Sequence, residues 1–501
     1  MDLMTWFEVS SLPWSRATQQ RKSLRRASIS WRPTVTTASE IWHGPYSTPL
    51  NSFSSSRLAT NYNNSNAKLF FLMDFKAFAG KSDTSRRQFM EGAAKSALGV
   101  SVATTFGAAL DQQKAFAEET AGGGKAKSLI YIFNSGGMTH LDTFDPKENN
   151  KKVMGDTETV STKVPGIRYG SHLKGLAEHA DKIAVINSMS SQNGAHAQAR
   201  YQMMTGYNQR ATIVHPHIGP FCEKFFGKRG DLLPDSVIVN RGTSNSGYLE
   251  PALSPLPVAN PTAGIANSTI MTSQERFNQR MEMSLDIGQN FVDKYQHYSS
   301  PKGYIEFYDQ ASRLLSSEEL KVFDLSGEKD RQKYGMNNLG QGCLLARRLV
   351  EKGVRVIEVH NGGWDMHAGI QDSLASRLPP YDQAVSALIS DLDQRGLLES
   401  TLVVTGTDFG RTSRINERAG RDHQPAVFST MFAGGGIAGG QKYGKSDADG
   451  RRVGENKVSV EDFHATIGYG LGVDLGYEIY SPSGRPFVFG NHGKPVTSLY
   501  A

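Results

Sequence analysis

The chain has 501 residues, of which 38% are hydrophobic and 21% charged, with 51 Gly and 20 Pro. This composition is that of a globular protein, and the length suffices for one large α/β domain or two ordinary ones. The net charge of +6 is unevenly spread. Residues 1–117 carry 14 Lys/Arg against 7 Asp/Glu, which leaves 41 against 42 for the remainder. Beyond residue 117 the chain therefore lacks the overall basic charge of a nucleic-acid-binding protein.

Residues 73–117 have the order of regions found in a signal peptide. Paired arginines stand at Arg86 and Arg87, a weakly apolar run extends from Ala93 to Leu110, and a small-x-small cleavage site follows at Ala115–Ala117. The Arg pair indicates the twin-arginine export route. The apolar run contains Lys95 and two threonines, so it is too polar for a stable membrane span, and we expect no transmembrane anchor after cleavage. The sequence thus predicts an exported protein, periplasmic or extracellular.

Residues 1–72 are rich in Ser, Thr, Asn and Arg and show no sustained apolar period. A signal peptide normally begins near its basic region, so this segment is either a mis-assigned start, with Met73 as the true first residue, or a disordered extension. We exclude residues 1–117 from the fold prediction.

The two cysteines, Cys222 and Cys343, lie 121 positions apart and form no CxxC motif. Such isolated cysteines are usually small buried residues. A disulfide after export remains the alternative.

After the glycines at 122–124, helices and short apolar strands alternate. Expected strands cover residues 128–133, 183–186, 354–359, 401–405 and 428–432, and expected helices cover residues 173–180, 342–352 and 381–395. This alternation predicts an α/β domain over residues 125–501 with a mostly parallel sheet and helices on both faces. Residues 215–335 are richer in Pro, Ser and Asn and are expected to form an irregular insertion or subdomain over the site.

Polar residues follow the predicted strands, where ligands bind in parallel sheets. Five segments are rich in His, Asp and Arg. They begin at Gly136, Asn193, His360, Thr407 and Gly420. If these segments meet at one edge, His and carboxylate side chains can hold a divalent metal, and Arg side chains can hold an anion. The predicted metal ligands are His140, Asp142, Asp365, His367, Asp408 and His423.

Each of these residues also has an ordinary structural interpretation. Asp365 can cap its own turn, Asp408 can cap a helix, and Arg411 can be a structural ion-pair partner. The prediction of a shared site therefore depends on the five segments occurring together rather than on any one of them.

Several stretches resemble known families. The segments from Ala387 to Gly410, from Ala433 to Gly440, from Val460 to Val473 and from His196 to Gly206 resemble motifs of the alkaline phosphatase and sulfatase superfamily. More closely, "GGMTHLDTFDPK", "GGWDMH", "TDFGRT" and "GRDHQP" are similar to hallmarks of the exported family called domain of unknown function 1501. The resemblance covers roughly residues 125–501 and implies an alkaline phosphatase-like fold.

Three positions depart from the superfamily pattern. His196 stands where sulfatases have the Cys or Ser nucleophile, Asn134 where a metal-binding Asp is usual, and Phe409 where the "SDHG" motif has His. The resemblance therefore implies the fold more firmly than the chemistry, with His140, Asp142 and His196 as possible replacements in a different metal site.

The sequence favours a metal-dependent hydrolase of a sulfate or phosphate ester, acting on an anionic ester or polysaccharide. Zn, Ca or Mg would be the metal. His196 would act as nucleophile or general base, with Arg200 and Arg411 binding the anion. The main alternative is a non-catalytic binding protein that recognises an anionic glycan or a partner protein. A phosphomutase or other group-transfer enzyme is a third reading. The glycine clusters match no nucleotide-binding motif.

Overall fold

The computed structural model describes residues 124–294 and 299–501, and the expected leader and its preceding segment lie outside these residues. A nine-stranded sheet forms its centre, in the order β12-β4-β11-β8-β1-β7-β5-β6, with β15 beside β4. All neighbouring strands are parallel except β11, which is antiparallel to β4 and β8. The predicted mostly parallel sheet is thus confirmed.

The sequence predicted five of the nine sheet strands, β1, β4, β7, β8 and β11, and missed the short strands β5, β6, β12 and β15. The nine strands have the following bounds. They are β1 (Ser128–Ser135), β4 (Ile183–Ser190), β5 (Ser236–Val239), β6 (Leu256–Val258), β7 (Val356–Gly362), β8 (Thr401–Thr407), β11 (Phe428–Ala433), β12 (Gln441–Tyr443) and β15 (Val458–Ser459). Smaller two-stranded sheets pair β2 (Thr159–Ser161) with β3 (Arg168–Gly170), β9 (Gly410–Arg411) with β10 (His423–Gln424), β13 (Lys445–Ser446) with β14 (Val453–Glu455), and β16 (Ile479–Tyr480) with β17 (Pro486–Phe487).

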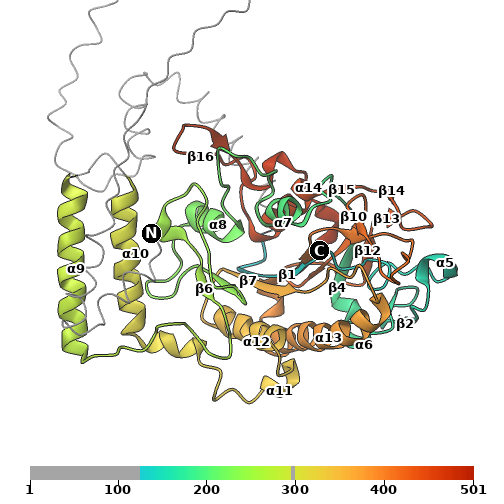
Figure 1. Ribbon diagram of the computed structural model, residues 1–501, viewed down its shortest axis with the longest axis horizontal. Helices are drawn as coiled ribbons and strands as arrows, with labels where there is room; N and C mark the ends of the chain where they lie inside the picture. Colours follow the sequence, from blue (N-terminus) through green and yellow to red (C-terminus); the bar gives the residue numbers. More distant parts are fainter. Residues whose placement is uncertain (1–123, 295–298) are drawn as a thin grey trace, which may run out of the picture. The chain divides into compact units, whose positions relative to one another are not determined.

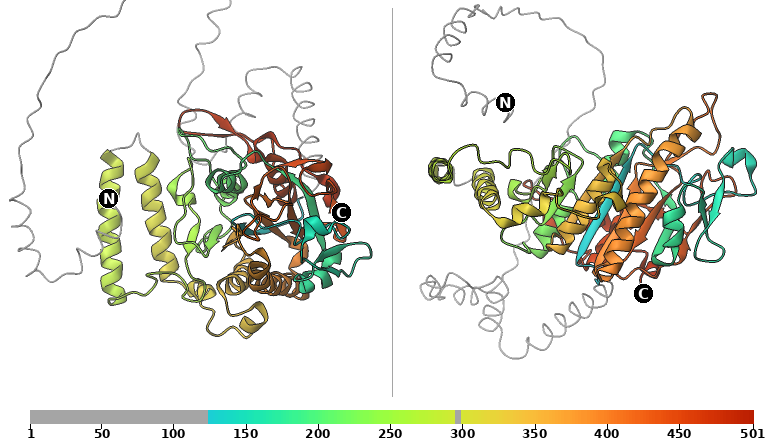
Figure 2. Two further views of the ribbon diagram at one scale, coloured as in Figure 1. Left: turned by 45° about the vertical axis from the view of Figure 1, so that its right-hand side comes forward. Right: turned by 90° about the horizontal axis from the view of Figure 1, so that it is seen from below.

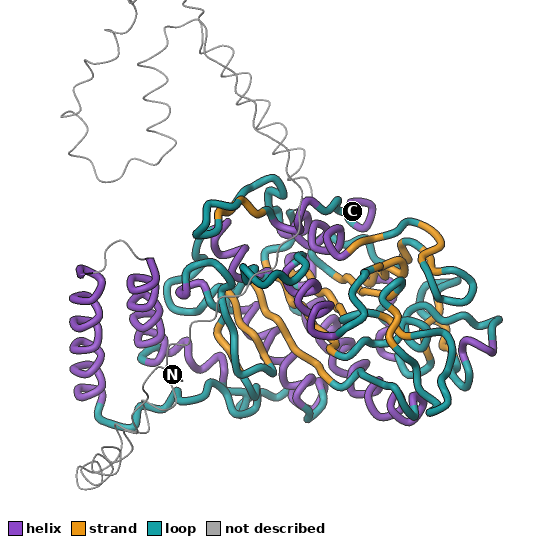
Figure 3. Tube along the Cα trace, turned by 45° about the horizontal axis from the view of Figure 1, so that its top comes forward, coloured by secondary structure: helices purple, strands orange, loops and turns teal. Residues whose placement is uncertain are grey.

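Helices cover both faces of the sheet (Figure 1). One face carries α6 (Lys174–Glu178), α12 (Asn338–Glu351) and α13 (Ile370–Gln394), and the other carries α7 (His196–Thr205), α8 (Ile218–Phe226) and α14 (Val460–Leu471). Figure 3 shows the strands enclosed by these helices and by long loops. Two short helices are α5 (Lys151–Met154) and α11 (Arg331–Tyr334), of which α11 packs against α12 and α13.

The central strand β1 shows why this arrangement is stable. Its residues are buried on both faces, and successive side chains point to opposite sides. Ile130 and Ile132 join the core under α12 and α13, whereas Tyr131 and Phe133 join the core under α14. A strand buried on both faces reads as a continuous apolar run, which is the pattern seen in the sequence.

Residues 215–335 differ from the expected insertion. They supply α8 and the strands β5 and β6, and β5 pairs with β7 in the main sheet. Strands β5 and β6 are so short that their apolar residues form no recognisable pattern in a segment rich in Pro and Ser. The part that leaves the sheet is the helix pair α9 (Gln274–Lys294) and α10 (Ser299–Leu315), which stands beside the remainder of the domain (Figures 1 and 2).

Helix α13 begins earlier than expected. The sequence predicts a start after Pro380, but the helix extends from Ile370 and includes Pro379 and Pro380. Its early turns are held by burial of Ile370, Leu374 and Leu378 in the core. Tertiary packing here outweighs the local cost of the prolines.

Cys222 and Cys343 are both free and buried, as expected for small core residues. Within the described ranges, no helix is long and apolar enough to cross a membrane.

Candidate metal centre

Three adjacent parallel strands bring the polar segments together. In the register of the sheet, Ser135 of β1 faces Gly362 of β7, and Asn134 faces Thr407 of β8. The segments after these strands therefore leave the sheet at the same edge. The prediction that separate polar segments meet at one edge of the sheet is confirmed for the segments after β1, β7 and β8.

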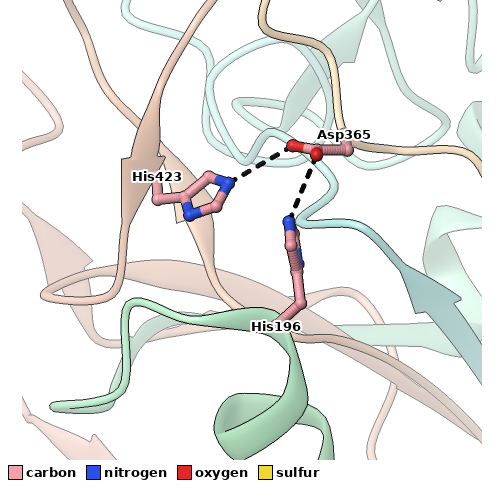
Figure 4. Close-up of side chains that lie close together, drawn as sticks. All are labelled: His196, Asp365 and His423. Carbon is pink, nitrogen blue, oxygen red and sulfur yellow. Dashed lines mark hydrogen bonds and ion pairs between the residues drawn. The ribbon is translucent and has the colours of Figure 1, made fainter.

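At this edge His196, Asp365 and His423 form a group whose potential ligand atoms all lie within 4.8 Å of one another (Figure 4). His196 is the first residue of α7, Asp365 lies in the loop between β7 and α13, and His423 lies on β10. His196 Nε2 is 3.4 Å and His423 Nε2 is 3.3 Å from an oxygen of Asp365. We call these three residues and His367 the histidine cluster.

His367 completes this cluster from the same loop as Asp365. Its Nε2 lies 3.0 Å from Asp365 Oδ1 and 2.9 Å from His423 Nε2. The Nε2 atoms of His196, His367 and His423 thus all lie near the Asp365 carboxylate.

The other ring nitrogen of each histidine faces an oxygen. His196 Nδ1 lies 2.7 Å from Asp408 Oδ2, His367 Nδ1 lies 2.8 Å from Asp422 Oδ1, and His423 Nδ1 lies 2.8 Å from the carbonyl oxygen of Gly194. A carbonyl or carboxylate accepts a hydrogen bond, so we assign the proton of each neutral ring to Nδ1. The Nε2 lone pairs then point into the cluster.

This tautomer assignment gives a test of whether a metal fits. Two Nε2 lone pairs of His367 and His423 would face each other at 2.9 Å, which is repulsive unless a proton or a cation lies between them. In addition, the buried His196 Nε2 makes no hydrogen bond in the described part of the chain. Imidazoles with Nδ1 bound to carboxylate or carbonyl oxygen are the usual arrangement around a protein-bound metal. The residues present therefore fit a metal ion.

Asp365 is anionic over the physiological range. Partial burial raises the pKa of its carboxyl group, but the hydrogen bond from Arg411 and the positive charge of that guanidinium lower it, and the pKa lies at about 2. The negative charge stands at the centre of the cluster, where it attracts a cation.

Arg411 has a different role from the one that the sequence suggested. The side chain is buried, and it donates hydrogen bonds to Asp365 Oδ1 and to the carbonyl oxygens of Gly136, Gly137, Trp364 and Arg421. Every nitrogen of the guanidinium is thus committed to the protein. Arg411 fixes Asp365 and the surrounding loops, and it has no free face for a substrate anion.

Asp142 and His140 lie outside the cluster. Asp142 forms a fully buried ion pair with Arg421 at 2.9 Å and also accepts a hydrogen bond from Thr139. His140 Nε2 lies 3.0 Å from the carbonyl oxygen of Gly450, and burial lowers the pKa of the imidazole. The metal-ligand prediction for these two residues is corrected accordingly, because the oxygens of Asp142 are already bound to cationic and hydroxyl donors.

Asp408 contacts the cluster through the Nδ1 side of the His196 ring. Its Oδ2 accepts hydrogen bonds from His196 Nδ1 and, at 2.8 Å, from the backbone N–H of Gly136. Burial raises the pKa of the Asp408 carboxyl group, and its contacts with His196 and Gly136 partly offset that rise. Asp408 contacts Nδ1 of His196, whereas the Nε2 atom of the same ring faces Asp365. Asp408 therefore orients His196 and is not itself one of the ligand residues, which corrects the prediction made from the sequence.

Arg200 lies one turn after His196 on α7 and is half-buried. Across the ranges that the structure covers, its side chain has no hydrogen bond and no acidic partner, yet its positive charge acts on Asp408. Its guanidinium is therefore available beside the cluster.

Sequence reasoning missed two supporting groups, Asp422 and the Gly194 carbonyl. Asp422 stands next to His423 in the "GRDHQP" segment, which gave a signal, but its contact with His367 depends on the fold. No sequence pattern marks a backbone carbonyl as a partner of a distant histidine.

The family model of DUF1501, described as a protein of unknown function, matches residues 126–500. The chain belongs to the DUF1501 family. The resemblance drawn from the sequence motifs is thereby confirmed. No curated protein matches the sequence.

Solved structures similar to this chain include the PsFucS1 sulfatase from Pseudoalteromonas sp., at 12% identity, covering 72% of each chain with a TM-score of 0.34. Alkaline phosphatase from the Antarctic bacterium TAB5 is 12% identical over 64% of this chain and 94% of its own, with a TM-score of 0.29. The lipoteichoic acid synthase LtaP from Listeria monocytogenes is 9% identical over 72% of this chain and 78% of its own, with a TM-score of 0.29. Sequence identities and TM-scores this low assign no activity to this chain.

Proposed function

We propose that this protein is a metal-dependent hydrolase of a sulfate or phosphate ester, with its divalent metal held by the histidine cluster. The observation that carries the proposal is the convergence of three imidazole Nε2 atoms on Asp365, each with its Nδ1 facing an oxygen acceptor. A metal bound there would act as a Lewis acid on an ester oxygen and would lower the pKa of bound water.

The residues of the chain supply the remaining requirements. His196, His367 and His423 offer neutral nitrogen ligands and Asp365 offers an anionic oxygen, while Arg411 keeps Asp365 in place. Arg200 can hold an anionic ester oxygen, because its guanidinium is not used by the protein and its planar fork matches sulfate or phosphate. These features favour an anionic ester or polysaccharide as substrate.

Replacing Asp365 tests this proposal. Asp365→Ala removes the only carboxylate of the cluster, so we expect loss of bound metal and at least a 100-fold drop in hydrolysis of aryl sulfates or phosphates, about 3 kcal/mol of transition-state stabilisation. Metal content is measured by elemental analysis and hydrolysis by release of the aryl alcohol. The matched control is Asp231→Ala, a change of an exposed aspartate. A variant with full metal content and full turnover would refute the proposal.

One observation favours a second candidate, a non-catalytic protein that binds an anionic glycan. The first position of α7 carries His196, whose ring is held between Asp408 and Asp365, and no Ser or Cys takes its place as a nucleophile. If this candidate is correct, the protein retains metal and binds a sulfated oligosaccharide in calorimetry, but it hydrolyses neither aryl sulfates nor aryl phosphates.

A further inference from the structure

We infer that the histidine cluster binds one ion per chain, and that this ion is zinc or a similar transition metal. We further infer that Asp408 is the positioning residue that makes His196 a ligand. Both inferences rest on the proposed function. The inference narrows the possible metals and assigns His196 to ion binding rather than to attack on the substrate.

The class of ion follows from the donor atoms. Imidazole nitrogens outnumber the carboxylate in the cluster of His196, Asp365, His367 and His423. Imidazole suits zinc and similar transition metals, whereas calcium and magnesium prefer shells made of oxygen. Two carbonyl oxygens of the surrounding loops, those of Gly194 and Trp364, accept hydrogen bonds from His423 and Arg411. With three imidazoles and one carboxylate, the donor set of the cluster thus favours zinc over magnesium or calcium.

The number of ions follows from the residues that pack against the rings of His196 and His423. Phe409 is fully buried, and its ring lies 4.9 Å from the ring of His196 and 4.5 Å from that of His423, measured between centroids. The neighbouring Asn134 is also fully buried and accepts a hydrogen bond from Asn361. An aromatic ring and paired amides offer no good ligand for a second ion. Among the described residues, only His196, Asp365 and His423 form a group of His, Cys, Asp or Glu side chains whose ligand atoms all lie within 4.8 Å of one another.

The role of Asp408 follows from the geometry of one ring. Asp408 Oδ2 lies 2.7 Å from His196 Nδ1 and is itself anchored by the N–H of Gly136, and the Asp408 side chain is inaccessible to solvent. The carboxylate therefore keeps the proton on Nδ1 and aims Nε2 at Asp365. Phe409 supports the same ring from its face. By contrast, the Asp422 partner of His367 is half-exposed and gives a looser support.

The test measures ion binding without turnover. Purified protein is loaded with zinc in the presence of millimolar magnesium and calcium, and the bound metals are determined by elemental analysis. We expect one zinc per chain and neither of the other ions. Affinity is then measured by competition with a chelator for the native protein and for Asp408→Asn, for which we expect a loss of about 10- to 100-fold.

A double variant separates a positioning role from a merely structural one. If Asp408 acts through His196, then Asp408→Asn causes no further loss of zinc affinity in the His196→Ala background. A purely structural effect would lower affinity equally in both backgrounds. Thermal unfolding of each variant verifies that it is folded, and Asp422→Asn provides a second positioning variant, which acts through His367, if Asp408→Asn does not fold.

Two results would overturn the inference while leaving the proposed hydrolase intact: two ions per chain, or replacement of zinc by magnesium or calcium. An equal effect of Asp408→Asn in both backgrounds would remove the positioning role. Absence of any bound ion would instead refute both this inference and the metal-dependent function.

Discussion

Arg411 and Arg421 show how far a residue's role depends on burial. The sequence makes Arg411 a candidate for anion binding, yet its guanidinium and that of Arg421 are both fully buried and saturated by carboxylate and carbonyl acceptors. Removing one partner of such a buried pair leaves an uncompensated charge and is strongly destabilising. Of the two arginines predicted to bind an anion, Arg200 is the one whose guanidinium has no acidic partner among the described residues.

A second buried charge lies away from the cluster, on β7. Glu358 is fully buried, and its Oε2 lies 3.1 Å from His217 Nδ1 and 3.7 Å from His360 Nε2. Burial raises the pKa of this carboxyl group, but the two histidines outweigh that effect and lower the pKa to about 2. The ionised form is therefore favoured by folding.

This shift predicts a dependence of stability on pH. The pKa of Glu358 is lower in the folded than in the unfolded protein, so its ionised carboxylate stabilises the fold. This stabilisation is complete above about pH 4.5 and is lost as the pH falls toward 2. Its full size is on the order of 3 kcal/mol. We expect the difference in unfolding free energy between the native protein and Glu358→Gln to shrink over this range, measured by urea unfolding at several pH values. The control is Glu399→Gln, an exposed glutamate. A difference that is constant between pH 7 and 3 would contradict the prediction.

At the scale of elements, the loop after β1 is packed against the loop after β7. Gly136 has a φ of +117°, and a Cβ atom at this position would lie 2.6 Å from the backbone N of Asp365. The N–H of Trp364 also donates to the Ser135 carbonyl. Glycine is required here because the two backbones approach each other and because of the positive φ.

Gly136→Ala should therefore displace Asp365 and weaken metal binding. We expect a loss of stability of about 1–3 kcal/mol from the strained backbone and at least a 10-fold loss of zinc affinity. Thermal unfolding and chelator competition measure the two effects. Gly166→Ala is the matched control, since Gly166 also has a positive φ of +83° but nothing within 4 Å of an added Cβ. Native affinity in Gly136→Ala would show that the loop contact does not position Asp365.

At the scale of the whole molecule, export is a proposal, because the leader lies outside the described residues. We propose that residues 73–117 direct the folded protein out of the cytoplasm by the twin-arginine route. In this case Arg86→Lys combined with Arg87→Lys leaves the protein unprocessed in the cytoplasmic fraction. Cell fractionation followed by immunoblotting measures this outcome.

The chain offers its own control for the export prediction. Arg25 and Arg26 form a second arginine pair within residues 1–72. If Met73 is the true start, Arg25→Lys combined with Arg26→Lys has no effect on export. Export that persists after changing Arg86 and Arg87 would contradict the twin-arginine assignment.

The sequence by itself determined the class of fold, the family and the neighbourhood of the site. Continuous apolar runs such as residues 128–133 identify strands that are buried on both faces, and polar residues after such strands identify the edge where ligands bind. These features are local in the chain, and so a pattern of residue types reveals them.

Only the tertiary structure decided which polar residues share the site. Asp142 and Asp365 look alike in sequence, but one is neutralised by Arg421 in the core and the other stands among three imidazoles. His196 and Asp408 are separated by 212 positions and meet only because α7 packs on β8. Ligand geometry depends on distances between segments far apart in the chain, and no local pattern of residues encodes those distances.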